Sequence, residues 1–363
     1  MFDLDLTIGE ARTRVVVRRD GLGTIGDLLS AALPSSSCAL LITDERVGSL
    51  YAAALLESVR SRGQKIFEYL IPAGESSKSL AVVQSLYEFL AEHRAGRDAA
   101  VVALGGGVVS DVAGFVAGTW KRGVPFVACP TTMEADVDAC LGGKTAINLP
   151  EGKNLVGVFH QPALIVVDPV CLRSLAPRDF RAGLAESVKH ALIADPSFFE
   201  WHESNAEVVL GGDEATIREL ILWNLRIKGD MVQRDPHEQR GVRVLLNFGH
   251  TIGHAIERAC DFSLRHGECV SLGLVAACRL SQRIGLLDET VVRRVTALLD
   301  RFQLPTRLAQ PIEPTRVIDA MGQDKKIEAG RLRFVLLEDL GRPIVRSSVT
   351  EESVRLVVDS LLV

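Results

Sequence analysis

The sequence predicts an α/β fold in which a Rossmann-like N-terminal α/β domain is followed by a mainly α-helical C-terminal domain. Its 363 residues suffice for about two domains at ~150 residues each. Short β-rich runs alternate with helical stretches in the first half, and apolar residues recur with a period of 3.6 from about Pro177 onward. We therefore place the boundary within Leu172–Pro177, giving domains of residues 1–174 and 175–363.

The first half shows alternating strand and helix patterns. Four strands are expected, at Ala39–Thr43, Lys65–Ile71, Ala99–Leu104 and Pro125–Cys129. Three helices are expected between them, at Val47–Arg62, Leu80–Glu92 and Val108–Trp120. Such alternation is typical of βαβ units built around a mostly parallel sheet.

The second half shows mainly helical periodicity. Helices are expected at Arg181–Ala194, Asp213–Arg234, Thr251–Cys260, Cys269–Ile284 and Glu289–Phe302. A late pair of strands is expected near Arg333–Leu337 and Pro343–Arg346. These elements predict a helical domain carrying a small hairpin.

Composition and charge exclude several classes of protein. The chain is 47% apolar and 24% charged, as in ordinary globular proteins. Its 41 basic and 46 acidic residues give a net charge of −5 without a long basic run, so nucleic acid is not an expected partner. The longest uncharged stretch, Leu28–Thr43, contains Pro34 and four serines and is too short for a membrane-spanning helix, so no membrane partner is expected.

The cysteines and the first residues indicate the compartment. Seven cysteines are scattered without a Cys-x-x-Cys pair, which predicts neither a disulfide framework nor a thiolate zinc site. The opening Met-Phe-Asp-Leu-Asp lacks the basic start and apolar core of a signal peptide. We expect a reducing, cytoplasmic environment.

A glycine-rich turn follows the third predicted strand. Gly105-Gly106-Gly107 comes directly after Ala99–Leu104 and precedes an apolar helix. Glycines at such a turn let backbone N–H groups approach a pyrophosphate, and the helix N-terminus favours negative charge. Ser110 stands where a third fingerprint glycine is expected, so a turn that serves packing alone is the alternative.

Two lysines lie in glycine-rich, otherwise apolar segments. Lys144 is in Gly142-Gly143-Lys144-Thr145, and Lys153 follows Gly152. Such cations can supply a phosphate or carboxylate site in an acidic protein, whereas solvated surface lysines are the ordinary alternative.

Histidines are concentrated in one segment. Three of the eight histidines, His250, His254 and His266, fall within 17 positions. With Glu186, which is followed three positions later by Lys189, they offer imidazole and carboxylate ligands for a catalytic divalent metal. Spacing alone selects His250 and His254, at i and i+4 of one helix, as the ligand pair. Histidines satisfied within the core are the alternative.

Taken together and in this order, these motifs resemble the 3-dehydroquinate synthase family of the sugar phosphate cyclase superfamily over almost the whole chain. The matching segments are Pro72–Leu80, Gly105–Asp111, Gly142–Thr145, Gly152–Leu155, Ala182–Glu186, Leu246–Ala255, His266–Glu268 and Asp324–Lys326.

The resemblance implies a role for each matching residue. It makes Glu186, His250 and His266 the ligands of Zn²⁺, with Co²⁺ as an alternative metal, and sets His254 apart as a catalytic group that contacts substrate. The resemblance assigns further residues to the substrate pocket, namely Asp138, Lys144, Asn154, Lys189, Arg243, Asn247, Lys228 and one of Lys325 or Lys326. Positions matching those that hold NAD are Asp44, Glu75, Lys78, Gly106, Gly107, Asp111, Thr131, Thr132, Lys144 and Lys153.

The reaction implied is conversion of a small sugar phosphate acid, 3-deoxy-D-arabino-heptulosonate 7-phosphate, to 3-dehydroquinate and phosphate in the shikimate pathway. Transient oxidation by NAD acidifies a C–H bond for phosphate elimination, after which hydride returns and an intramolecular aldol step closes the ring. Arg122 matches an arginine offered to the neighbouring subunit's substrate, which implies a homodimer.

The chain departs from the family pattern in two places. Glu134 and Asp136 put carboxylates into a segment that is usually mostly apolar. The segment from Asp235 to Arg243 is one residue longer than in some relatives, which makes the match of Lys228 weaker than that of Arg243.

Three other functions compete with this one. The first is a sugar phosphate cyclase of the 2-epi-5-epi-valiolone or 2-deoxy-scyllo-inosose synthase type. In such an enzyme the pocket residues that would contact a substrate carboxylate are expected to be replaced, whereas this chain retains Asn247 and His254. An iron-type alcohol or glycerol dehydrogenase typically has an aspartate and more histidines at its metal. A non-catalytic NAD-binding protein is expected to have lost a ligand or a pocket lysine.

Overall fold

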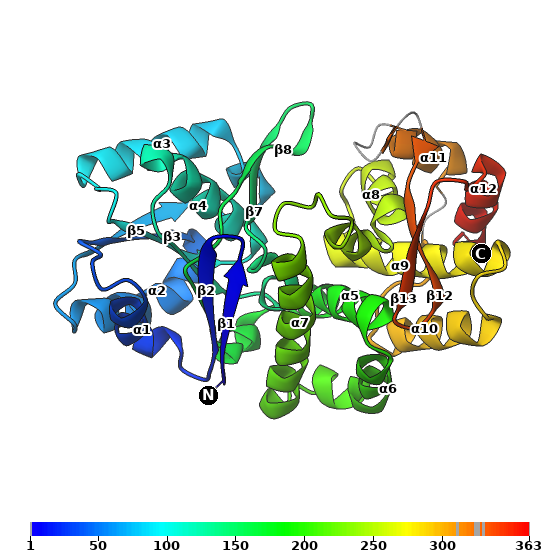
Figure 1. Cartoon of the computed structure of the whole chain (residues 1–363), viewed down its shortest axis with the longest axis horizontal. Helices are drawn as coiled ribbons and strands as arrows, with labels where there is room; N and C mark the ends of the chain where they lie inside the picture. The colour runs from blue at the N-terminus through cyan, green and yellow to red at the C-terminus, as the bar shows by residue number, and fades with distance from the viewer. Residues whose placement is uncertain (1, 310–311, 323–326, 329–330, 363) are drawn as a thin grey trace. The chain divides into compact units, whose positions relative to one another are not determined.

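The computed structural model describes residues 2–309, 312–322, 327–328 and 331–362 (Figure 1). The chain forms two compact units. The first comprises Met1–Leu175 with Lys228–His237, and the second comprises Ala176–Ile227 with Glu238–Val363. Within the described ranges, no helix is long and apolar enough to cross a membrane.

The first unit is built on a seven-stranded sheet. Its strands lie in the order β1 (Phe2–Ile8), β2 (Ala11–Val17), β9 (Leu164–Val167), β6 (Phe126–Pro130), β5 (Ala100–Gly105), β3 (Ala39–Asp44) and β4 (Ile66–Ile71). All neighbouring pairs are parallel except β1 with β2. The predicted βαβ organisation is therefore confirmed, and a hairpin that the periodicity did not reveal forms one edge.

Four helices connect these strands: α1 (Ile25–Ala32), α2 (Glu45–Arg60), α3 (Leu80–Glu92) and α4 (Gly107–Thr119). Apolar residues of α1 and α2, including Leu29 and Leu55, form one cluster with sheet residues such as Leu41, Val102 and Val127. These sheet residues are fully buried, which explains why the strands read as continuous apolar runs. A separate hairpin of β7 (Lys144–Leu149) and β8 (Gly152–Phe159) packs against α4.

The second unit is mainly helical, as predicted. Its helices are α5 (Pro177–Ala194), α6 (Pro196–Leu210), the greater part of α7 (Glu214–Arg234), α8 (His250–Ala259), α9 (His266–Arg283), α10 (Glu289–Arg301), α11 (Pro314–Gly322) and α12 (Glu351–Ser360). The expected strand pair is present as β12 (Phe334–Asp339) and β13 (Arg342–Arg346), and β10 (Ile327–Glu328) pairs with β11 (Arg331–Leu332). Helix α7 is shared, because its residues from Lys228 onward belong to the first unit.

A chain of buried polar groups runs between α5, α6 and α7. The Ser187 hydroxyl is 2.8 Å from Nε2 of His202 and accepts from the Asn224 amide at 2.7 Å. Asn224 Oδ1 is 2.8 Å from Nδ1 of His190, and His202 Nδ1 is 2.7 Å from the Phe198 carbonyl. All four polar side chains are fully buried, so these hydrogen bonds satisfy groups that burial would otherwise destabilise.

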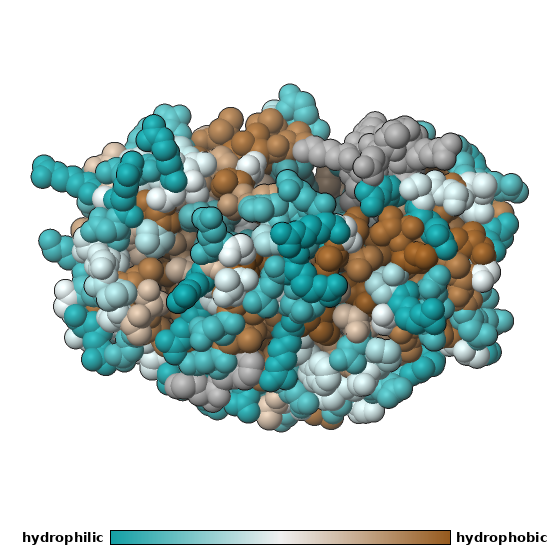
Figure 2. All heavy atoms as spheres, in the orientation of Figure 1, coloured by the Kyte–Doolittle hydropathy of each residue, from teal (hydrophilic) through white to brown (hydrophobic). Residues whose placement is uncertain are grey.

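Hydrophilic residues are spread over the face of the molecule drawn in Figure 2, with hydrophobic patches between them. The exposed large apolar side chains include Leu70, Leu80 and Phe159 in the first unit and Phe262 and Leu356 in the second. Scattered apolar side chains of this kind are normal on a protein surface.

Candidate functional site

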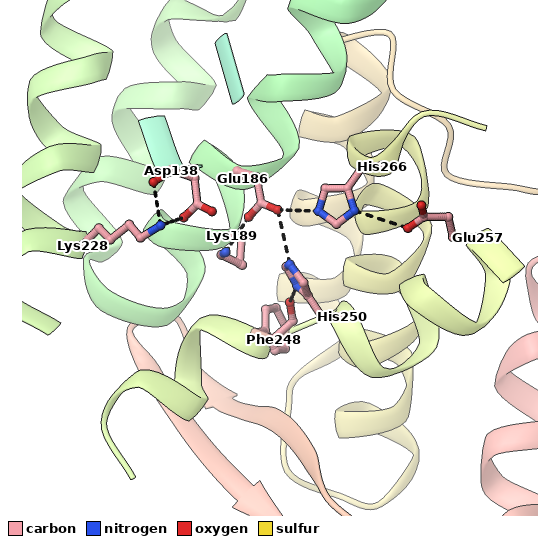
Figure 3. Close-up of polar contacts among 8 residues, drawn as sticks. All are labelled: Asp138, Glu186, Lys189, Lys228, Phe248, His250, Glu257 and His266. Carbon is pink, nitrogen blue, oxygen red and sulfur yellow. Dashed lines mark hydrogen bonds and ion pairs between the residues drawn. The ribbon is translucent and has the colours of Figure 1, made fainter. Parts of the chain in front are cut away.

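Three helices of the second unit bring a carboxylate and two imidazoles together (Figure 3). Glu186 lies in the middle of α5, whereas His250 begins α8 and His266 begins α9. Oε1 of Glu186 is 3.3 Å from Nε2 of His250 and 3.2 Å from Nε2 of His266. One carboxylate oxygen thus faces the same ring nitrogen of both histidines.

Two glycines allow these helices to approach so closely. A Cβ atom on Gly267 would lie 1.9 Å from the Ala182 carbonyl oxygen, so only glycine lets the start of α9 pass this close to α5. Gly249 precedes His250 with φ +78°, a left-handed conformation that glycine adopts without strain. These glycines therefore position the helix ends that carry His250 and His266.

The other ring nitrogens of the two histidines face hydrogen-bond acceptors. Nδ1 of His250 is 3.1 Å from the Phe248 carbonyl oxygen, and Nδ1 of His266 is 3.4 Å from Oε2 of Glu257. A hydrogen on each Nδ1 would satisfy these contacts and leave each Nε2 able to bind a metal. Glu257 was not among the predicted site residues, although its position seven residues after His250 puts it on the same face of α8.

A buried ion pair fixes the charge of the carboxylate. Lys189 contacts Oε2 of Glu186, and the two side chains are 2% and 1% exposed. Burial alone would raise the pKa of Glu186, but Lys189 and then His250 outweigh it and hold that pKa well below its usual range. Burial lowers the pKa of His250, which Glu186 opposes only in part. These shifts favour an anionic Glu186 beside a neutral His250, which are the charge states that bind a metal.

The donors fit a divalent metal with nitrogen and oxygen preference. In a tetrahedron with bonds of about 2.0–2.1 Å, ligand atoms lie ~3.3 Å apart, which agrees with the 3.2 and 3.3 Å separations here. His254 joins them, because one nitrogen from each of His250, His254 and His266 lies within 4.8 Å of the others. The structure therefore brings together both the pair chosen by spacing and the set implied by the resemblance.

In the first unit, the predicted cofactor residues gather at one edge of the sheet. Asp44 ends β3, Glu75 and Lys78 follow β4, Gly106 and Gly107 follow β5, and Thr131 and Thr132 follow β6. These four strands are parallel neighbours, so their carboxyl ends meet at the edge where ligands bind in open α/β sheets.

The glycine-rich turn provides unblocked backbone N–H groups. Gly106 precedes α4 in an extended conformation, and no side chain caps the helix. A Cβ atom on Gly106 would lie 2.9 Å from Cγ2 of Thr132, so the turn and the end of β6 are in close contact. This arrangement suits the pyrophosphate of a dinucleotide. Asp44, by contrast, caps α2 by accepting from Arg46 and Val47 at 2.9 Å.

A polar network adjoins this edge. The buried ammonium group of Lys78 contacts Asp111 and Asn154. Asn148 donates to Glu75 at 2.8 Å and accepts from the backbone of Asn154 at 2.9 Å. Burial raises the pKa of Asp111, and Lys78 counteracts it. Asn148 was not predicted, and its side-chain bonds to two predicted residues are visible only in the folded hairpin.

Asp138 lies in a short π-helical turn at Ala135–Ala139. The Lys228 ammonium donates to its carbonyl oxygen at 2.6 Å and lies 2.8 Å from its Oδ1. Lys228, whose match to the family pattern is the weaker one, thus contacts Asp138, a predicted pocket residue.

Asp136, in the same π-helical turn, is fully buried. Burial is the main cause, and the charge of Asp168 the second, that raises the pKa of Asp136 well above its usual value. Burial therefore favours the neutral form of this carboxyl.

The remaining predicted residues differ in environment. Arg243 is buried, and Asn247 donates to Glu238 at 3.3 Å. Lys144 and Lys153 are exposed on the hairpin of β7 and β8. Arg122 is exposed with φ +71° in the turn after α4. Lys325 and Lys326 lie outside the described residues.

Comparison with known proteins gives two matches to family models. Residues 68–182 match the model described as 3-dehydroquinate synthase N-terminal, and residues 183–327 match the one described as 3-dehydroquinate synthase C-terminal. A curated 3-dehydroquinate synthase from Symbiobacterium thermophilum is 42% identical over 357 residues, covering 98% of this chain and 99% of the relative.

Solved structures of two other cyclases resemble the chain as a whole. A 2-deoxy-scyllo-inosose synthase in complex with carbaglucose-6-phosphate, NAD⁺ and Co²⁺ is 25% identical, with a TM-score of 0.90 over 99% of this chain and 100% of that one. A 2-epi-5-epi-valiolone synthase from Streptomyces hygroscopicus with NAD⁺ and Zn²⁺ bound is 28% identical, with a TM-score of 0.89 over 98% of both chains.

Proposed function

Because this chain belongs to the 3-dehydroquinate synthase family, we propose that it converts 3-deoxy-D-arabino-heptulosonate 7-phosphate to 3-dehydroquinate and phosphate with NAD and a divalent metal. One observation carries the chemistry: Oε1 of Glu186 faces Nε2 of both His250 and His266. Such a carboxylate and imidazole set leaves positions open for substrate oxygens on a bound metal.

Glu186, His250 and His266 are the proposed metal ligands, and Zn²⁺ or Co²⁺ is the proposed ion. Two structural neighbours that bind NAD⁺ with Co²⁺ or Zn²⁺ support this choice. His254 lies beside the ligands and remains available to move protons. Lys189 neutralises part of the charge on Glu186.

NAD is proposed to bind at the carboxyl edge of β3 to β6. The backbone at Gly106 and Gly107 would hold the pyrophosphate, and the residues after β4 and β6 would surround the rest. When both groups are bound, NAD exchanges hydride with the substrate and the metal polarises its hydroxyl oxygens.

The other predicted pocket residues are proposed to bind the two anionic ends of the substrate and to control protons. Lys144 and Arg243 supply cations for phosphate and carboxylate, and the carbonyl and carboxylate oxygens of Asp138 hold Lys228. Asn247 orients polar groups, and His254 accepts and returns protons during elimination and ring closure.

The assembly proposed is a homodimer in the cytoplasm. Arg122 is exposed in a left-handed conformation that non-glycine residues rarely adopt, and its side chain makes no hydrogen bond or ion pair within the described parts of the chain. An arginine held outward in this way is suited to a substrate bound by a second copy. No disulfide joins any of the seven cysteines, all of which lie in the described parts of the chain, and this supports a reducing compartment.

A direct assay tests this function. The purified protein is incubated with NAD, Zn²⁺ and an equal mixture of the heptulosonate phosphate and sedoheptulose 7-phosphate, and the products are separated by mass. We expect 3-dehydroquinate to dominate, because buried cations are left unpaired by an analogue that lacks the carboxylate. A dominant valiolone-type product would instead favour the cyclase activity named for one of the structural neighbours.

A further inference from the structure

We propose that Glu257 is a positioning residue of the metal centre, which selects Nε2 of His266 as the ligand atom by accepting a hydrogen bond from Nδ1. This inference rests on the proposed metal function. The contact is 3.4 Å from Oε2 of Glu257 to Nδ1 of His266, within the second unit.

Glu257 lies on the face of α8 that carries the histidines. His250, His254 and Glu257 are at positions i, i+4 and i+7 of this helix. The Glu257 side chain is 10% exposed, so its carboxylate is largely withdrawn from water. Burying a carboxylate is unfavourable unless hydrogen bonds compensate, and the ring of a proposed metal ligand supplies one here.

The two carboxylates at His266 lie at opposite edges of its ring (Figure 3). Oε1 of Glu186 faces Nε2 at 3.2 Å, whereas Oε2 of Glu257 faces Nδ1 at 3.4 Å. Glu257 is thus on the side of the ring away from the proposed metal. A carboxylate that receives the second N–H of a ligand histidine fixes the tautomer, orients the ring and raises its basicity.

His266 needs this support more than His250 does. The His250 side chain is 10% exposed and its Nδ1 meets a backbone carbonyl two residues away. The His266 side chain is 30% exposed and is the first residue of α9, so packing restrains its ring less. Glu257 thus provides the hydrogen-bond acceptor for Nδ1 of His266, as the Phe248 carbonyl does for Nδ1 of His250.

The first test measures Zn²⁺ affinity by competition with a chromophoric chelator. Loss of an outer-shell partner typically weakens metal binding by about 10–100-fold, and we expect this for Glu257→Ala. Glu257→Gln retains an oxygen that can accept from Nδ1, so its loss should stay within about 10-fold.

Glu268 provides a matched control. It lies two residues after His266, but its carboxylate pairs with Arg178 at 2.6 Å and accepts from the Arg265 backbone at 2.9 Å. Glu268→Gln should therefore leave Zn²⁺ affinity unchanged. Thermal unfolding followed by circular dichroism establishes that each variant is folded.

The second test uses the Zn²⁺-loaded protein, in which the metal takes the place of any hydrogen between Nε2 of His266 and Glu186. Imidazole ¹⁵N NMR should show His266 bound to the metal through Nε2 with hydrogen on Nδ1 in the unmodified protein, and an altered Nδ1–H signal in Glu257→Ala. Unaltered Zn²⁺ affinity in a folded Glu257→Ala protein, or a His266 bound through Nδ1 in the unmodified protein, overturns the proposal. If the unmodified protein binds no Zn²⁺, the proposed metal function itself fails, and this inference fails with it.

Discussion

Lys189 and Glu186 lie three residues apart on α5 and form an ion pair whose side chains are 2% and 1% exposed. The other oxygen of the same carboxylate faces two histidines. The carboxylate that pairs with Lys189 is therefore also the proposed metal ligand.

Replacing Lys189 by Met should destabilise the second unit as well as abolish turnover. The change leaves the buried carboxylate without its cation, which typically costs about 3–5 kcal/mol. Urea unfolding of the metal-free protein measures the loss, with the exposed Lys65→Met as control. If the free energies of unfolding of Lys189→Met and Lys65→Met differ by less than about 1 kcal/mol, the ion pair contributes little to stability.

Acidification should destabilise the protein through His202. Burial lowers the pKa of His202 to about 4, with His190 lowering it further and the Phe198 carbonyl opposing both. Because the unfolded chain has the higher pKa of about 6.5, it binds the proton first as pH falls. The neutral His202 therefore contributes about 3 kcal/mol to the free energy of unfolding above pH ~6.5, and this contribution is lost as the pH falls toward ~4.

His202→Gln should remove most of this dependence. We expect the free energy of unfolding by urea to fall less between pH 7 and pH 4.5 in the variant than in the unmodified protein. His93→Gln, in the first unit, is the control for the loss of one imidazole. Equal slopes for all three proteins would mean that other groups govern acid unfolding.

Arg243→Ala should weaken use of the substrate far more than binding of NAD. Arg243 is buried, and removal of a charged partner from a buried contact costs about 2–5 kcal/mol. We expect kcat/KM for the heptulosonate phosphate to fall accordingly, while the Kd of NAD measured by fluorescence stays the same. Comparable losses for both ligands would count against the proposed role.

The nicotinamide should be restored in every turnover. In the proposed reaction, hydride removed at the start returns after elimination, so the overall reaction needs no external oxidant or reductant. We expect phosphate release without NADH absorbance at steady state. NADH formed in step with phosphate would point to a dehydrogenase instead.

Secondary structure was predictable where one pattern dominated. The strand at Ala39–Thr43 and the helix at Leu80–Glu92 recur almost unchanged as β3 and α3. The β1–β2 and β7–β8 hairpins were not predicted, because each depends on pairing between segments rather than on a long periodic run. Helix α6 begins at Pro196 after Asp195, whose side chain caps it, a local signal that periodicity overlooks.

The candidate site was predictable in composition more than in geometry. Spacing selected His250 and His254 because both lie on α8, but it cannot relate α8 to Glu186 on α5 or to His266 on α9. Those relationships depend on close helix contacts that Gly267 allows. Glu257 and Asn148 escaped notice because each acts on a neighbour through a hydrogen bond that only the folded structure reveals.

Complementation between inactive variants should test the role of Arg122. If Arg122 serves the substrate of the partner subunit, then Arg122→Ala and His250→Ala are each inactive as homodimers for different reasons. A mixed dimer contains one site that has both an intact His250 and an intact Arg122 from its partner, and a second site that lacks both. With random reassociation of equal amounts, half of the dimers are mixed, so about a quarter of the sites should be active. Co-refolding the variants and measuring phosphate release should recover roughly this fraction of the unmodified rate, whereas mixing without subunit exchange should recover none. An Arg122→Ala protein that is fully active alone, or a mixture that never gains activity although mixed dimers are isolated, would place Arg122 outside the neighbouring site.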